Sequence, residues 1–135
     1  MQDRPTALEL LDVVREFLDR EVVPALDGRL RFHARVAANV LAIVGRELAG
    51  EEDALRAEWT RLAALEGRPG APMPEGAAAA RAAIHAATAA LAERIRRGEL
   101  DGARAVRAHV RATVQEKLAA ANPRYLAGAP SDRTE

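Results

Sequence analysis

The sequence predicts an all-α fold, a single-domain bundle of four or five helices. The chain has 135 residues, the size of one ordinary domain. Alanine supplies 32 of them and arginine 19, and both residues are strong helix formers. Strand-favouring aromatic residues are few, and apolar residues recur at helical spacing along most of the chain. We therefore expect a helical bundle over residues 1–126 and a disordered tail over 127–135.

The first helix is predicted to begin at Thr6, because Thr6 and Glu9 have the spacing of a capping box. Its apolar stripe is Leu8, Leu11, Val14, Leu18 and Val22. Pro24 should end or kink this helix near Val23, since proline lacks a backbone N–H group.

The second helix is expected over residues 30–49, with Gly50 as its C-terminal cap. Its apolar stripe consists of Leu30, Ala37, Val40, Leu41, Val44 and Leu48, widened by Phe32, Val36 and Ile43. A helix that is apolar around most of its circumference is expected at the centre of the fold. The narrow polar strip holds Arg31, Arg35, Asn39 and Arg46, with Ala38 and Ala42 between them.

Three further helices follow. The third covers residues 51–67, starts with three acidic residues that suit the helix dipole, and ends at Gly67. A proline-rich loop over residues 68–74 leads to the fourth, over residues 75–97. The fifth begins after Asp101 and ends before Asn122-Pro123. The stripe predicted for the fifth helix is Ala103, Val106, Val110, Val114, Leu118 and Ala121.

Several function classes are disfavoured. The chain has no cysteine, which removes thiolate nucleophiles, zinc fingers and iron–sulfur clusters. It lacks Gly-x-Ser-x-Gly, Gly-x-Gly-x-x-Gly, the phosphate-binding Gly-x-x-x-x-Gly-Lys loop, and paired Glu-x-x-His motifs. We expect no metal and no cofactor, and the sequence favours a non-enzymatic role without deciding the question.

Charge and hydropathy bear on partners and location. The 20 acidic and 20 basic residues cancel, whereas nucleic-acid-binding domains are usually basic. The longest apolar run, residues 36–44, falls short of the roughly 20 residues of a membrane span, and no apolar signal segment is seen at the N-terminus. We expect a cytoplasmic protein without nucleic-acid or membrane partners.

Two rows of polar residues are the candidate contact sites. Arg31, Arg35 and Asn39 are four residues apart, so they align on one side of the second helix. One interpretation is an ion pair from Arg31 or Arg35 to an acidic residue of the first helix (Asp12, Glu16 or Asp19), since a buried arginine needs a partner. The other is recognition of an anionic ligand or an acidic partner surface.

Arg104, Arg107 and Arg111 form the second row, beside the apolar stripe of the fifth helix. This row is either a solvated flank or part of an interface, where arginine beside apolar surface is common. The histidines are less informative. His33 is predicted to be a core or inter-helix histidine, with a ligand contact as the alternative, and His85 and His109 are predicted to face solvent.

Three stretches carry a resemblance to a known family: Asp3 to Leu11, Gly28 to Asn39, and Asn122 to Leu126. They resemble an uncharacterised family of small bacterial all-helical proteins. Members of that family accompany aminoglycoside-phosphotransferase-like kinases and acyl-CoA-dehydrogenase-like enzymes. The resemblance implies an accessory subunit in the catabolism of hydroxy acids as CoA thioesters, and it supplies no catalytic residues.

Three functions are consistent with these observations. The first is a non-catalytic accessory subunit that binds the kinase or the dehydrogenase-like enzyme. The second is a stand-alone acyl-CoA-binding protein or small enzyme, with a pocket on the second helix lined by Arg31, His33, Arg35 and Asn39. The third is a structural homo-oligomer, because alanine-faced helices pack closely.

Overall fold

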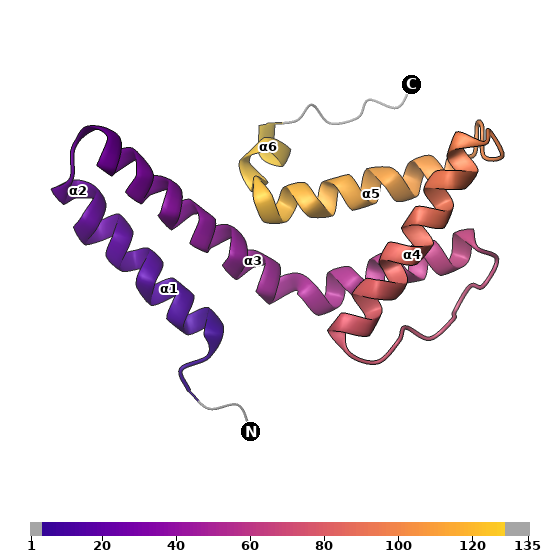
Figure 1. Cartoon of the computed structure of the whole chain (residues 1–135), viewed down its shortest axis with the longest axis horizontal. Coiled ribbons are helices and arrows are strands. Elements are labelled where there is room, and N and C mark those ends of the chain that lie inside the picture. Colours follow the sequence, from indigo (N-terminus) through magenta and orange to yellow (C-terminus); the bar gives the residue numbers. More distant parts are fainter. Residues whose placement is uncertain (1–3, 129–135) are drawn as a thin grey trace. The chain divides into compact units, whose positions relative to one another are not determined.

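The structure is a computed structural model that describes residues 4–128, and each regular element in this range is a helix (Figure 1). The all-α prediction is confirmed. The elements are α1 (Ala7–Phe17), the π-helical turn η1 (Leu18–Val22), α2 (Val23–Ala25), α3 (Gly28–Leu65), α4 (Ala77–Arg96), α5 (Arg104–Ala121) and α6 (Pro123–Gly128). The predicted tail covers residues 127–135. Its residues 127 and 128 belong to α6, and residues 129–135 lie outside the described residues.

The start of α1 has the predicted capping box. The Thr6 hydroxyl accepts a hydrogen bond from the Glu9 backbone N–H at 3.2 Å, and the Glu9 carboxylate accepts one from the Thr6 N–H at 2.7 Å. These two bonds satisfy donors that have no partner inside the helix.

The end of the first helical segment lies beside Pro24, as predicted. The backbone widens into the π-helical turn η1, and the Val23 N–H donates to the Leu18 carbonyl, five residues back. Since Pro24 has no N–H to continue this pattern, α2 stops at Ala25. Val23 is buried at 7% exposure, which anchors the turn.

The predicted boundary at Gly50 is wrong, because α3 runs unbroken from Gly28 to Leu65. A glycine that caps a helix adopts a positive φ angle. Gly67, just beyond the end of α3, does so with φ +74°, whereas Gly50 keeps a helical conformation. The acidic residues that follow Gly50 therefore lie inside α3 and not in the first turn of a new helix.

This continuity predicts that Gly50→Ala raises the free energy of unfolding by about 0.5–1 kcal/mol. A Cβ atom at position 50 meets no other atom within 4 Å, so the substitution adds helix propensity without a clash. Urea denaturation followed by circular dichroism measures the effect. Gly67→Ala is the control and should destabilise, because alanine rarely adopts a positive φ. A loss of stability in Gly50→Ala would mean that the helix breaks at this residue.

The chain divides into two compact units. The N-terminal unit comprises the residues up to Gly50 with Ala120–Asn122, and the C-terminal unit comprises Glu51–Ala119 with the residues from Pro123 on.

The C-terminal unit contains a hydrophobic core where α4 and α5 meet the second half of α3. Its buried members are Trp59, Leu62, Ala63, Ile84, Ala87, Leu91 and Val106. The alanines let the helix backbones approach closely around the larger side chains. The predicted positions of Trp59 and Leu62 on the buried side, and of the α4 stripe around Ile84 and Leu91, are confirmed.

The N-terminal unit is a helical hairpin in which α1 runs alongside the first half of α3, joined through η1, α2 and a short turn (Figure 1). The buried residue on this half of α3 is Ala38, at 3% exposure, and Ala34, Leu41 and Gly45 on the same side are half-buried. The small side chains at these positions allow close approach of a neighbouring helix.

Most of the apolar stripe that was expected to make α3 central is exposed, although its members Leu41 and Val44 are half-buried. Leu30, Val40 and Leu48, which were predicted to lie in its core stripe, are 45–58% exposed. The buried Ala38 comes from the predicted polar strip. A similar correction applies to α5, where Val106 and His109 are buried while Val110 and Val114 are exposed. In both helices the packed side is rotated away from the most apolar side.

Candidate functional site

The residues predicted as a site on the second helix lie on the surface of α3. Arg31, His33, Arg35 and Asn39 are all exposed. They do not converge, because two residues along a helix turn the chain by about 200°, which places His33 on the side opposite Arg31.

The prediction that His33 is a core or inter-helix histidine is wrong. Its ring is exposed and makes an edge contact with the ring of Phe32, with centroids 5.6 Å apart. The alanine side of α3 occupies the buried position, so a histidine on the far side of the helix meets solvent.

The ion pairs expected between α3 and the acidic side of α1 are replaced by local ones. Arg15 lies 3.3 Å from Asp12 and 3.5 Å from Asp19, and Arg20 lies 2.6 Å from Glu16. These partners are three or four residues apart on the same helical segment, where they meet without ordering another element. Exposed pairs of this kind contribute only about 0.3–0.5 kcal/mol each. Arg46 of the predicted polar strip donates a hydrogen bond from its Nε to the Ala120 carbonyl at 2.7 Å.

The second row, Arg104, Arg107 and Arg111, is exposed on α5. The exposed side chains of Val110 and Val114 belong to the same side of this helix. The combination is an apolar strip with arginines beside it, which is the composition that suggested an interface.

A polar cluster that the sequence did not reveal lies between α3 and α5 in the C-terminal unit. Arg61 donates to both carboxylate oxygens of Glu116, at 2.7 and 2.6 Å. His109 is buried at 6% exposure, so the prediction that it faces solvent is wrong. Its Nδ1 atom and the Nε atom of Arg61 are buried without a hydrogen-bond partner in the described structure. His109 is buried because it lies on the same side of α5 as Val106, and this is the side that packs on the core.

This cluster predicts a loss of stability at acidic pH. Burial lowers the pKa of His109, the positive charge of Arg61 lowers it further, and Glu58 and Glu116 act in the opposite direction. The unfolded chain therefore binds a proton more readily, so the stabilisation present above pH about 6.5 is lost as the pH falls through the folded-state pKa.

Urea denaturation between pH 5 and pH 8 tests this prediction. His109→Gln should flatten the pH dependence of the unfolding free energy. His85→Gln is the matched control, since His85 is exposed on α4, and it should keep the wild-type profile. Equal profiles in all three proteins would contradict the assignment.

The N-terminal hairpin exposes a large amount of apolar side chain. In residues 4–50, Val23 and Ala38 are the buried hydrophobic residues. Six exposed ones define what we call the apolar face: Leu10, Val13 and Phe17 of α1, and Leu30, Val40 and Leu48 of α3. Each of these side chains is 45–66% exposed. Soluble monomers rarely leave contiguous apolar patches of this kind uncovered.

Helical spacing places the six residues on one side of the hairpin. In α1 the half-buried positions Leu11, Arg15 and Leu18 turn toward α3, which leaves Leu10, Val13 and Phe17 together beside the contact. In α3 the side of Ala38 turns toward α1. Leu30 and Leu48 lie about a quarter turn from Ala38, and Val40 lies farther round in the same direction, almost opposite to Ala38. Because the two helices are antiparallel, both sets fall on the same side. The charged residues Asp12, Asp19 and Arg35 fall on the other.

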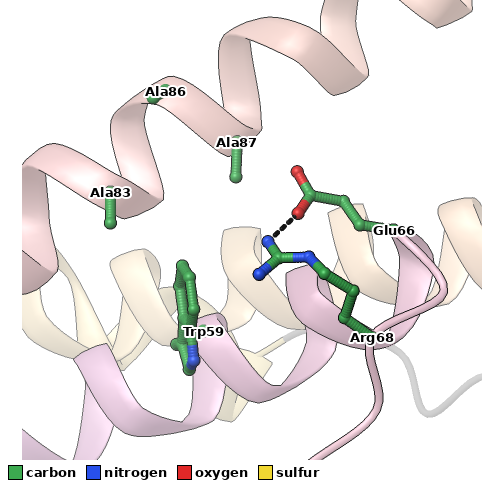
Figure 2. A pocket seen from close by; sticks show the side chains of 6 residues that line it. All are labelled: Trp59, Glu66, Arg68, Ala83, Ala86 and Ala87. Carbon is green, nitrogen blue, oxygen red and sulfur yellow. Dashed lines mark hydrogen bonds and ion pairs between the residues drawn. The ribbon is translucent and has the colours of Figure 1, made fainter. Parts of the chain in front are cut away.

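A groove lies between the end of α3 and α4, with an accessible volume of about 350 Å³ (Figure 2). Its lining residues are Trp59, Glu66, Arg68, Ala83, Ala86 and Ala87. The indole N–H of Trp59 donates to the Ala71 carbonyl at 2.9 Å, and the Arg68 guanidinium lies 5.7 Å from the centre of the indole ring. Arg68 also forms an ion pair with Glu66, drawn in Figure 2.

Two classes of site find no support in the part of the chain that the structure describes. Within residues 4–128, no three histidine or acidic side chains are grouped so that they could hold a metal ion. Among the described helices, none combines the length and apolar character needed to cross a membrane.

Comparison with known proteins identifies the family. A family described as a domain of unknown function (DUF6285) matches residues 24–125, most of the chain. The chain belongs to the DUF6285 family. No curated protein and no solved structure matches it. The DUF6285 match covers α3, α4 and α5, and therefore both the groove and the α3 half of the apolar face, while α1 lies before its first residue.

Besides the cluster around Arg61 and His109, the apolar face and the groove of this DUF6285 protein were not predicted from the sequence, and the apolar face left a signal there. Leu10, Val13 and Phe17 have the spacing of a second apolar stripe on the first helix. A short surface helix that is apolar on two sides has more apolar surface than one neighbour can cover. The groove left no comparable signal, because it depends on how α4 packs on α3.

Proposed function

We propose that this DUF6285 protein is a non-catalytic accessory subunit that docks onto a larger enzyme through the apolar face of its hairpin. The observation that carries the proposal is the exposure of six large apolar side chains on one side of a unit with little core of its own. Covering the exposed half of each such side chain contributes on the order of 1 kcal/mol.

The partner that we propose is an aminoglycoside-phosphotransferase-like kinase that acts on a hydroxyacyl-CoA in a bacterium, with an acyl-CoA-dehydrogenase-like enzyme as the second choice. This identification comes from the family resemblance of the stretches around Leu8 and Leu30. The apolar face supports a protein partner in general and does not distinguish between the two enzymes.

Co-expression with an aminoglycoside-phosphotransferase-like kinase from the same genome tests the proposal. Size-exclusion chromatography with light scattering should show one complex that contains both chains, and a kinase assay should respond to the addition of this protein. The dehydrogenase-like enzyme is tested in the same way. If neither enzyme forms a complex or changes its activity, the proposal fails.

The same face supports a homo-oligomer as a second candidate. Light scattering of the chain alone distinguishes the two: a stable dimer that does not exchange its subunits for the kinase would favour self-association. The acyl-CoA pocket considered on the second helix gains no comparable support, because Arg31, His33, Arg35 and Asn39 do not converge on α3.

A further inference from the structure

We propose that the groove between α3 and α4 binds a small soluble amphipathic anion, a carboxylate or phosphate group joined to a short apolar chain. This inference is independent of the docking face, since all the groove residues belong to the C-terminal unit.

The floor and the wall of the groove are apolar, and this indicates a ligand with an apolar chain. The polar atom of the Trp59 side chain is already bonded to the Ala71 carbonyl, and the residue is 7% exposed, so the indole offers the groove a small and wholly apolar patch. Ala83 and Ala87 of α4 form the wall that faces Trp59, and Ala86 lies at the outer edge of the groove (Figure 2). Larger side chains at these positions would fill the space that three methyl groups leave open. The groove is open to solvent and has a volume of about 350 Å³, so it suits a small ligand that stays partly in contact with water.

The charged part of the ligand follows from Arg68. Its guanidinium points toward Trp59 in Figure 2 and is held near the ring by a cation–π contact. The ion pair with Glu66 uses Nη2, and no other hydrogen bond of the guanidinium is present in the described structure, so Nη1 and Nε keep N–H groups that can donate to a bound oxygen.

The neighbouring carboxylate does not cancel this preference. The Arg68 side chain is 54% exposed, and the Glu66 side chain is 29% exposed. Both residues line the groove, and the Arg68 guanidinium is the more accessible of the two charges. Arginine binds planar oxyanions such as carboxylate and phosphate through paired hydrogen bonds.

Trp59 provides the assay, because it is the single tryptophan of the chain and lines the groove. The full chain is titrated with hexanoate, hexyl phosphate, hexanol and inorganic phosphate while tryptophan fluorescence is recorded. We expect saturable changes with the two amphipathic anions, and at least about tenfold weaker binding of hexanol and of phosphate alone. The two anions together show whether carboxylate or phosphate is preferred.

Variants locate the site. Arg68→Gln should weaken binding of the anions about tenfold or more and leave hexanol unchanged. Ala83→Leu should block the anions and hexanol alike, because Ala83 lines the groove on the side of α4 that faces Trp59 in Figure 2, and a leucine there would fill the space. The matched controls are Arg96→Gln and Ala89→Leu, both at exposed positions of α4 outside the groove lining, and both should bind as wild type. Circular dichroism checks that each variant keeps its helices, and Arg68→Lys keeps the charge if Arg68→Gln unfolds.

Two results would overturn the inference. One is the absence of a saturable change with either anion at millimolar concentration. The other is binding of hexanol as tight as that of hexanoate, with no effect of Arg68→Gln, which would leave an apolar groove without an anion site.

Discussion

Val13→Asp is expected to weaken binding of the proposed partner enzyme by about a hundredfold or more and to leave the stability of the isolated chain almost unchanged. Val13 is the most exposed of the six side chains of the apolar face, at 66% exposure. In the free chain an aspartate at this position stays in water. In the complex it would be covered by apolar surface, and an unpaired buried charge costs several kcal/mol.

The measurement is the affinity of wild-type and variant chains for the kinase, by calorimetry or by surface-based binding. Val114→Asp is the matched control, since it makes the same substitution on α5 at a side chain that is 49% exposed. If Val114→Asp abolished binding and Val13→Asp did not, the docking surface would lie on α5 beside Arg107 and Arg111. If the wild-type chain and both variants bound with equal affinity, neither the apolar face nor the surface on α5 would be the docking site.

Leu62→Ala lowers the free energy of unfolding by about 2–5 kcal/mol, the largest stability effect that we expect from a single substitution. Leu62 is 1% exposed and lies in the core of the C-terminal unit among side chains of α3, α4 and α5. Truncation removes buried apolar surface and leaves a cavity that helices anchored by close alanine contacts cannot readily close. For a domain this small, such a loss is a large fraction of the total stability.

Urea denaturation followed by circular dichroism measures the loss. Leu10→Ala is the control, because Leu10 is 53% exposed on the apolar face, and its effect should stay within about 0.5 kcal/mol. A loss below about 1 kcal/mol for Leu62→Ala would contradict the core described for this unit. The comparison also separates the two units, since the first substitution affects folding and the second affects only docking.

The candidate site was only partly accessible from the sequence. The rows of arginines on α3 and α5 are exposed, but His33 does not join the first row, and the acidic residues of α1 pair with Arg15 and Arg20 instead. The apolar face combines residues from two helices, and the groove depends on how α3 and α4 pack. Neither can be read from the spacing within a single helix.

The sequence by itself determined the features that depend on neighbouring residues. These are the helical class, the capping box at Thr6, the stop at Pro24 and the glycine after the end of α3 at Gly67. Each rests on hydrogen bonds or backbone angles within about five residues, so the local sequence suffices.

Only the tertiary structure decided whether α3 stops at Gly50 and which side of α3 and α5 is buried. A glycine can end a helix or continue it, and the choice here makes α3 a single helix of 38 residues. An apolar stripe predicts that one side of a helix will be covered. It does not say whether the same chain or another molecule covers that side. In α3 the side of Ala38 is buried within the chain because small side chains let α1 come close, and the larger side chains of Leu30, Val40 and Leu48 are left at the surface.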